Sequence, residues 1–323
     1  MNNNILITSA GQRVSLVKFF QREVKKLDKE NKVYTVDAHP ILAPACIVSD
    51  GYHKIAKVTE ENYIQELLLL CQKWNIKLIV PTIDTELLVL SQNKEIFIEK
   101  GITPIVSSID FVTKCRDKRL TNLFFEANDI NIPKAIDKYN PSFPLFIKPY
   151  NGSLSKDIYL IKEQSELKDY HLSNPDFMFM EYINPDAYSE FTVDTYYNKD
   201  NELKCIVPRE RIYVRAGEIN KGVTRKNEII DIIKQRLSKI EGAIGCITMQ
   251  FFFNKKTKEV IGIEINPRFG GGYPLSYLAG ANYPEYILKE YILNEQISSF
   301  EQWEENLLML RYDDEILVRS YEN

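Results

Sequence analysis

Short apolar runs alternate with amphipathic segments along the first hundred residues. The runs at 4–10, 32–38, 76–82 and 102–108 have the length and composition of strands. Between them lie segments with helical spacing of apolar positions, and the segment 59–75 carries acidic residues in its first turn, as helices prefer. Strands that alternate with helices in this way predict a parallel α/β sheet.

The pattern changes at about residue 110. A long amphipathic stretch, 109–129, is predicted to form one helix. Strand-like runs then dominate, and two of them flank a Gly/Ser loop in the segment 143–161. The segment 246–266 reads as a β-hairpin, and helices are predicted at 228–245 and 283–294. We therefore expect a mixed α+β region after the α/β domain.

Composition and charge exclude several classes of protein. The chain has 44% hydrophobic and 27% charged residues, which is ordinary for a soluble globular protein. A net charge of -4 argues against a general nucleic-acid binder. We find no apolar run long enough to cross a bilayer and no signal peptide. The dispersed five cysteines and three histidines indicate a reduced, cytoplasmic compartment and argue against a zinc site or a histidine triad.

The first strand ends in a turn with Gly11, and Asp37 ends the second strand. In open α/β sheets such positions face the ligand crevice, which raises the hypothesis of an NAD-dependent oxidoreductase. The GxGxxG fingerprint is absent, however, because this turn has one glycine. Gln12 and Arg13 stand where a helix N-terminus could meet an anion.

Asp84 and Glu86 stand where a strand gives way to a helix. Acids are common at this place because they cap the helix and suit its dipole, and we favour that interpretation. The alternative is a role at the edge of the sheet that faces the second half of the protein.

Two segments of the second half suggest anion and ribose binding. Lys148 ends an apolar strand, where an amine is costly unless it meets an anion, and Gly152 and Ser153 follow it. A hairpin turn with an incidental lysine explains the segment about equally well. Glu190 begins another strand, from which its carboxylate could accept hydrogen bonds from ribose hydroxyls.

The strongest signal is the segment 260–280, "VIGIEINPRFGGGYPLSYLAG". Glu264 and Asn266 share one face of a strand, and Gln250 on the preceding strand is expected diagonally near Glu264. Carboxylate and amide oxygens so placed suit Mg²⁺, which takes few protein ligands besides phosphates. Arg268 follows at once, and phosphoryl transfer uses such a set of groups. We expect the glycines 270–272 to let the backbone pass close to a reacting anion on the acceptor side.

The order of these segments resembles the ATP-grasp superfamily, in the branch similar to the carbamoyl-phosphate synthetase large subunit and carboxylate–amine ligases. It rests on "CRDKRLT", "FIKPYNGSLSKD", "MEYI", "SEFTVD", "MQFFF" and "EINPRFGGG", while "ILITSAGQR … IVPTIDTEL" is similar to the pre-ATP-grasp domain. The resemblance implies a Rossmann-like pre-ATP-grasp domain at 1–110, an ATP-binding lid subdomain at 111–185 and a metal and acceptor subdomain at 186–323.

The resemblance also implies roles for single residues. Lys118 and Lys148 would hold ATP phosphates under the loop with Gly152 and Ser153. Adenine would be bound by Glu181, Tyr182 and Ile183, and the ribose by Glu190. Mg²⁺, with Mn²⁺ as an alternative, would be held by Glu264, Asn266 and Gln250, and Arg268 would stabilise the transferred phosphoryl group. One departure is Gln250, which stands where an acid would give a second Mg²⁺ more negative charge.

The implied activity is an ATP- and Mg²⁺-dependent ligation of a small-molecule carboxylate to an amine through an acylphosphate. From their residue type we add Arg211 and Arg215 as candidates for binding the substrate carboxylate or the acylphosphate, because the guanidinium fork suits oxyanions. A solvated basic face is the alternative. A non-catalytic ATP-binding regulatory protein is the competing functional hypothesis. The resemblance allows a homodimer, and no nucleic acid or membrane partner is expected.

Overall fold

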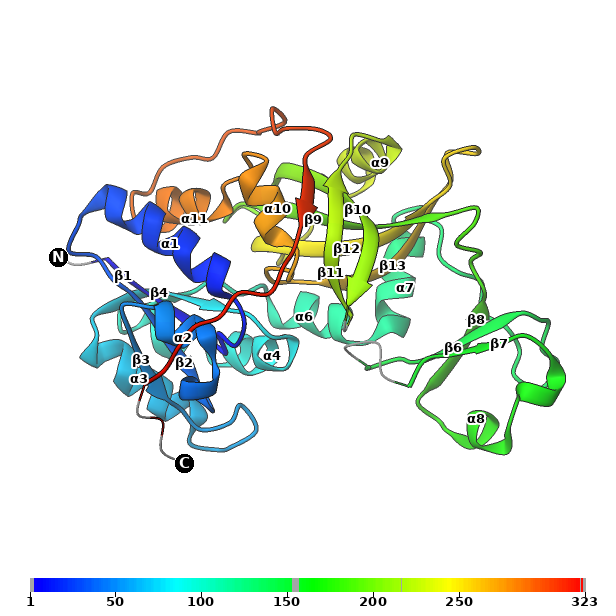
Figure 1. Ribbon diagram of the computed structural model, residues 1–323, viewed down its shortest axis with the longest axis horizontal. Helices are drawn as coiled ribbons and strands as arrows, with labels where there is room; N and C mark the ends of the chain where they lie inside the picture. The colour runs from blue at the N-terminus through cyan, green and yellow to red at the C-terminus, as the bar shows by residue number, and fades with distance from the viewer. Residues whose placement is uncertain (1–2, 153–156, 216, 320, 322–323) are drawn as a thin grey trace.

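The computed structural model describes residues 3–152, 157–215, 217–319 and 321. They form a five-stranded, a three-stranded and a six-stranded sheet, which confirms the predicted α/β plus α+β class. Figure 1 shows the five-stranded domain beside the six-stranded sheet, with the three-stranded sheet as a separate lobe at the far end. In the described part of the chain, no helix has both the length and the apolar character that a membrane crossing requires.

The N-terminal domain is a parallel sheet with strand order β3-β2-β1-β4-β5. Its order reverses between β1 and β4, and ligands bind at such a point outside the carboxyl ends of the strands. The strands are β1 (Asn4–Thr8), β2 (Val33–Asp37), β3 (Gly51–Lys54), β4 (Ile76–Pro81) and β5 (Thr103–Pro104), and the helices are α1 (Val14–Leu27), η1 (Pro40–Leu42), α2 (Pro44–Val48), α3 (Tyr63–Lys73), α4 (Asp84–Gln92) and α5 (Lys94–Ile98).

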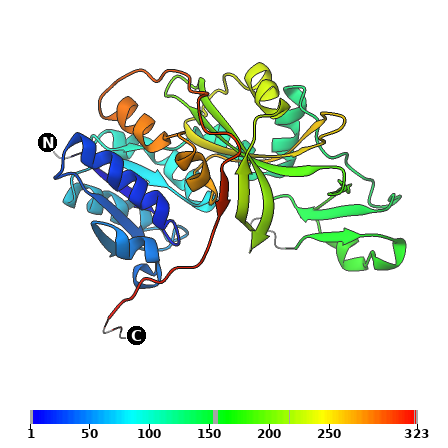
Figure 2. The ribbon, with the colours of Figure 1, turned by 45° about the horizontal axis from the view of Figure 1, so that its top comes forward.

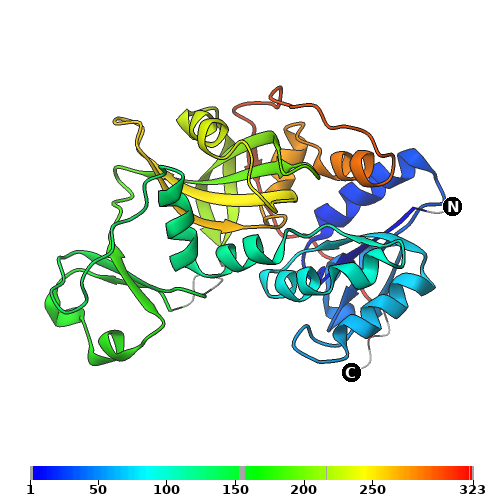
Figure 3. The same ribbon diagram turned by 180° about the vertical axis from the view of Figure 1, so that it is seen from behind.

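Two helices connect this domain to the rest of the chain, as Figure 3 shows from behind. The prediction of one helix over 109–129 is wrong. Asp117 is extended and separates α6 (Ile109–Arg116) from α7 (Lys118–Ala127). Its carboxylate accepts a hydrogen bond from the backbone N–H of Arg119 at 2.9 Å, so a capping acid starts a second helix here.

The three-stranded lobe is antiparallel with strand order β7-β6-β8. The predicted strand pair around the Gly/Ser loop is present, with Leu145 opposite Ile161. The elements are β6 (Leu145–Pro149), β7 (Tyr159–Ile161), η2 (Gln164–Glu166), α8 (Asp169–Ser173) and β8 (Phe177–Glu181).

The six-stranded sheet is antiparallel with strand order β13-β12-β9-β10-β11-β14. The predicted hairpin at 246–266 forms β12 and β13, whereas the helix predicted at 228–245 ends early, at Arg236. The elements are β9 (Ser189–Tyr197), β10 (Leu203–Arg215), β11 (Glu218–Thr224), α9 (Glu228–Arg236), β12 (Gly245–Phe253), β13 (Val260–Asn266), α10 (Tyr273–Leu278), α11 (Tyr283–Tyr291) and β14 (Leu308–Leu310).

One hydrophobic core joins the N-terminal domain to the six-stranded sheet, because α1 packs on α10 and α11. Phe19 stacks on Tyr277 with ring centroids 3.7 Å apart, and the Tyr277 hydroxyl donates to Glu23 at 2.7 Å. Phe20 meets Phe269 edge to face. Figure 2 shows the C-terminal segment running on from β14 and down past the N-terminal domain.

The domain boundaries near residues 110 and 185 stay predictions.

Candidate active site

A cavity of about 720 Å³ lies where the three sheets meet. The N-terminal domain contributes Asp84 at the carboxyl end of β4, the small lobe contributes Lys148, and the large sheet contributes Glu264. The predicted site residues among those that line it are Lys118, Lys148, Gly152, Glu181, Tyr182, Ile183, Glu190, Arg211, Gln250, Glu264, Asn266 and Arg268. Ser153 lies outside the described residues.

Gln250, Glu264 and Asn266 form one cluster, which we call the oxygen cluster. Glu264 Oε1 accepts hydrogen bonds from Gln250 Nε2 at 2.8 Å and from Asn266 Nδ2 at 3.1 Å. Gln250 lies directly opposite Glu264 in the strand pair, and the register shifts just after Gln250. The expected diagonal placement is therefore wrong, and the direct pairing brings the amide closer than predicted.

The oxygen cluster fits a magnesium ion. It combines one carboxylate with two amides, whose oxygens can face a cation once the amides rotate, and Mg²⁺ uses one or two carboxylates with phosphates and water. The described residues contain no group of three or more His, Cys, Asp or Glu placed to hold a metal. The protein alone therefore supplies little negative charge here, and a cation would depend on an anionic ligand.

Two lysines stand beside the oxygen cluster. Lys118, the first residue of α7, donates from Nζ to the carbonyl of Gly152 at 2.7 Å and lies 3.7 Å from Glu264 Oε2. Lys148 on β6 is buried. Burial lowers the pKa of Lys148 to about 8; nearby Lys118 acts in the same direction and Glu264 against it. A buried amine with a lowered pKa is a group prepared to meet an anion.

Glu181 and Glu190 lie at the side of the cavity next to the small lobe. Glu181 ends β8, and its Oε1 accepts from the backbone N–H of Lys134 at 2.9 Å. Glu190 on β9 pairs with Arg211 Nε at 3.3 Å. Burial raises the pKa of Glu190, and the Arg211 guanidinium opposes that rise. The Glu190 carboxylate therefore already has a cationic partner in the protein.

The basic end of β10 does not act as one surface. Arg209 and Arg211 line the cavity, whereas Arg215 is not among the lining residues; it is half exposed and pairs with Asp313 on the C-terminal segment. Strict alternation would put all three on one face of the strand. The register between β10 and β11 shifts twice between Arg211 and Val214, and this irregularity breaks the alternation.

Arg268 connects the N-terminal domain to the large sheet across the cavity. Its Nη2 donates to Asp84 Oδ2 at 2.7 Å and to Asn266 Oδ1 at 3.4 Å. Asp84 does not cap α4, because Ile83 is the N-cap and the cap has no side-chain hydrogen bond. Asp84 and Glu86 do lie in the first turn of α4, where the helix dipole favours acids, and Asp84 in addition reaches Arg268. Glu86 is fully buried, accepts a hydrogen bond from Tyr63, and has its pKa raised by burial.

A fully buried ion pair supports the floor of the cavity. Arg209 Nε and Nη2 donate to the two carboxylate oxygens of Asp194 at 2.8 and 3.0 Å, and neither side chain is exposed. Asp194 also accepts from Thr248 at 3.1 Å and from Ser276 at 2.6 Å. Every carboxylate oxygen of Asp194 therefore has a donor, whereas Arg209 Nη1 is buried without a hydrogen-bond partner, so the pair is satisfied on the acid side only.

The three glycines after Arg268 line the cavity, but the groups they accommodate are protein side chains. A Cβ on Gly272 would lie 2.1 Å from Arg209 Nη1, and a Cβ on Gly271 would lie 2.5 Å from the Glu218 carboxylate. A Cβ on Gly270 would lie 3.0 Å from Thr248. The glycines therefore allow close packing against Arg209, Glu218 and Thr248, and the expectation that they make room for a reacting anion stays a prediction.

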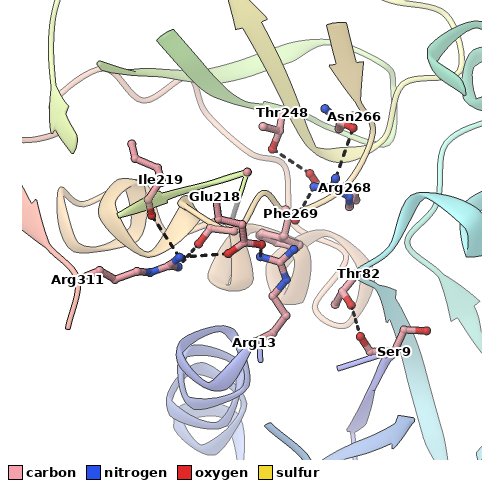
Figure 4. A network of polar contacts seen from close by, with 12 residues as sticks. Ser9, Arg13, Thr82, Glu218, Ile219, Thr248, Asn266, Arg268, Phe269 and Arg311 are labelled. Carbon is pink, nitrogen blue, oxygen red and sulfur yellow. Dashed lines mark hydrogen bonds and ion pairs between the residues drawn. The ribbon is translucent and has the colours of Figure 1, made fainter. Parts of the chain in front are cut away.

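Figure 4 shows an ionic network beside the N-terminal end of α1. Arg13, the N-cap of α1, lies 3.1 Å from Glu218 Oε1, and Arg311, just after β14, lies 3.2 Å from Glu218 Oε2. Arg311 also donates to the carbonyls of Ile219 and Gly271. Sequence reasoning noted Arg13 as a residue beside a helix N-terminus, but it gave no sign of Glu218 or Arg311.

The carboxylate of Asp37, next to the turn with Gly11, is already bound by backbone groups of the protein. The backbone N–H groups of Gly11 and His39 donate to the two oxygens of Asp37 at 3.1 and 2.9 Å. The carboxylate that would bind a ribose in an NAD-dependent enzyme thus holds the protein's own loops, and the oxidoreductase hypothesis is not favoured.

A parallel α/β domain followed by two antiparallel sheets around one cavity defines an ATP-grasp type of fold, as the resemblance implied. Residues 5–105 match a family model described as the PylC-like N-terminal domain. Residues 173–313 match one described as ATP-grasp in the biosynthetic pathway with Ter operon. These two matches agree with the resemblance to the ATP-grasp superfamily that the sequence suggested. No curated protein sequence matches the chain.

Several solved structures share this fold at low sequence identity. N5-carboxyaminoimidazole synthetase from Staphylococcus aureus, complexed with ADP, is 16% identical with a TM-score of 0.68, over 93% of this chain and 80% of that one. Biotin carboxylase from Campylobacter jejuni is 16% identical with a TM-score of 0.72, over 95% and 74%. L-amino acid ligase from Bacillus licheniformis is 16% identical with a TM-score of 0.66, over 90% and 74%.

Proposed function

We propose that the protein is an ATP- and Mg²⁺-dependent ligase that activates a small-molecule carboxylate and joins it to an amine or a similar nucleophile. The observation that carries the proposal is the convergence of Lys118, Lys148, the oxygen cluster and Arg268 on one cavity. Cations for phosphates, oxygen donors for a divalent ion and an arginine next to them are the parts that phosphoryl transfer needs.

The nucleotide would lie between the small lobe and the large sheet. Lys118 and Lys148 would bind phosphate oxygens. Glu181 with the backbone of Tyr182 and Ile183 would face adenine. Glu190 would accept from the ribose, which requires it to share or leave its pair with Arg211.

The reaction balances as two displacements. A carboxylate oxygen of the substrate attacks the γ-phosphorus, the bond to the ADP oxygen breaks, and an acylphosphate forms. The amine nitrogen then attacks the acyl carbon, phosphate leaves, and the nitrogen loses a proton to water. The magnesium ion, held by Glu264 and Asn266 and more weakly by Gln250, would neutralise phosphate charge. Arg268 would bind the transferred phosphoryl oxygens.

Two steps test this proposal on the full chain. A thermal-shift comparison of ATP·Mg, ADP·Mg and NAD should give stabilisation by the adenine nucleotides with magnesium and none by NAD. A screen of carboxylates and amines should then reveal a pair that releases ADP. Stabilisation by NAD alone would overturn the ligase, and nucleotide binding without ADP release from a broad panel would favour the regulatory protein.

Glu264→Gln provides the decisive variant. ADP release should fall roughly a hundredfold or more, because a metal supplies several kcal/mol of charge stabilisation. Glu228→Gln is the matched control, since Glu228 pairs with Lys258 and does not line the cavity. Equal turnover of the two variants would contradict the role of the oxygen cluster. The protein's own substrates, and a homodimer, stay predictions.

A further inference from the structure

Three arginines from distant segments meet beside α1: Arg13 and Arg268 line the cavity, and Arg311 does not line it but lies 3.2 Å from Glu218, which does. Arg13 begins α1, Arg268 follows β13, and Arg311 follows β14. The charges that act on Arg13 are those of Glu218, Arg268, Arg311 and Asp84. Asp84, Glu264 and Glu218 in turn act on Arg268, so the three cations are matched by three carboxylates, and the cations are free for a ligand only where one of these carboxylates gives way.

Glu218 occupies the space between two of these arginines. Its Oε1 lies 3.1 Å from Arg13 and its Oε2 lies 3.2 Å from Arg311, so each carboxylate oxygen has a guanidinium of its own. Burial raises the pKa of Glu218, but the two guanidinium groups outweigh burial and hold that pKa below its usual value. The site between Arg13 and Arg311 is therefore shaped for a carboxylate.

The Glu218 side chain lies where it can move away from Arg13 and Arg311. Glu218 is the first residue of β11 and follows Gly217, which has a positive φ of 78°. Its side chain is 40% exposed, whereas Asp194 in the neighbouring ion pair is not exposed at all. Glu218 and Gly217 both line the cavity, so a ligand can reach the pair from inside.

We propose that Arg13 and Arg311 bind a carboxylate of the substrate that takes no part in the reaction, and that Glu218 holds their place until the substrate arrives. This inference rests on the proposed function and names its substrate class. The substrate that supplies the amine would then be an amino acid: its amine reacts, and its own carboxylate does not react but binds Arg13 and Arg311. Arg268 lies between this carboxylate site and the oxygen cluster, so the reacting group of that substrate would face Arg268.

The test compares amino acids with their amides. The L-amino acids and the corresponding amides are titrated into the full-chain protein in the presence of ADP·Mg, with binding followed by calorimetry. At least one amino acid should bind, and its amide should bind about tenfold or more weakly, because a charge-assisted hydrogen bond is lost. No binding by any amino acid, or equal binding of acid and amide, would overturn the inference.

Two variants locate the effect. Arg311→Gln should weaken binding of the amino acid about tenfold and leave its amide within about twofold, while Glu218→Gln should tighten binding of the amino acid a few-fold because the internal competitor loses its charge. Arg236→Gln is the matched control, an arginine of α9 whose pair with Asp129 at 2.6 Å lies outside the cavity lining. An Arg311→Gln variant with unchanged discrimination between acid and amide would overturn the inference.

The outcome separates the inference from the proposed function. If the acid–amide preference depends on Arg311 but no substrate pair releases ADP, the carboxylate site stands and the ligase fails. If ADP is released at equal rates with acids and amides, the ligase stands and the carboxylate site fails.

Discussion

Nucleotide binding should weaken as the pH rises above about 8, because Lys148 loses its charge there. Burial lowers the pKa of this amine to about 8 in the ligand-free protein. Phosphate oxygens favour the charged amine, so above that pH a nucleotide must bind together with a proton. One pH unit above the pKa leaves about one amine in eleven charged, and the Kd for ADP·Mg should rise roughly tenfold, or about 1.4 kcal/mol.

Calorimetry of ADP·Mg binding between about pH 7 and pH 9.5 measures this effect. The logarithm of Kd should be flat below pH 8 and rise by about one per pH unit above it. Titrations in two buffers with different ionisation enthalpies should show nearly one proton taken up per nucleotide at about pH 9.

Lys148→Arg is the control, because its guanidinium stays charged throughout this range. The variant should bind ADP·Mg more weakly overall but without the rise above pH 8. A wild-type Kd that is constant from pH 7 to pH 9, or an equal rise in Lys148→Arg, would refute the assignment of Lys148 to the phosphates.

Two further predictions concern the floor of the cavity. Asp194→Asn should lower the free energy of unfolding by about 3–5 kcal/mol, because it leaves the Arg209 charge buried without a counter-ion. The double variant Asp194→Asn/Arg209→Met should recover part of that loss in urea denaturation, and no recovery would contradict the charge argument. Gly272→Ala should cost about 1–3 kcal/mol by overpacking against Arg209, although its φ of -88° suits alanine. An unchanged urea midpoint for Gly272→Ala would show that Arg209 moves aside.

Local pattern was enough to predict the parts of the site that lie within one strand or one hairpin. Period-two alternation put Glu264 and Asn266 on one face, and the structure joins their side chains. Arg215 was chosen from its residue type alone, and the register shifts of β10 near it have no signal in the sequence. The break at Asp117 had a readable signal, an acid where a helix can be capped.

The contacts between distant segments had no such signal. Arg268 meets Asp84 from 184 residues away, and Arg311 reaches Glu218 from a short strand that the apolar pattern did not indicate. Periodicity describes which face a residue occupies, but the partner of that face depends on how the domains pack. No pattern in the sequence therefore indicated that Asp84 would meet Arg268.

The contact between Gly272 and Arg209 has a consequence for protein engineering. The glycines after Arg268 look like a motif that would work in any scaffold. The third of them, Gly272, is however required by Arg209, which lies 63 positions earlier in the chain and is held by Asp194. Transplanting "EINPRFGGG" into another scaffold would move the glycines without the arginine that they accommodate. A graft or a chimera of this region must therefore carry β9, β10 and the glycine segment together as one unit.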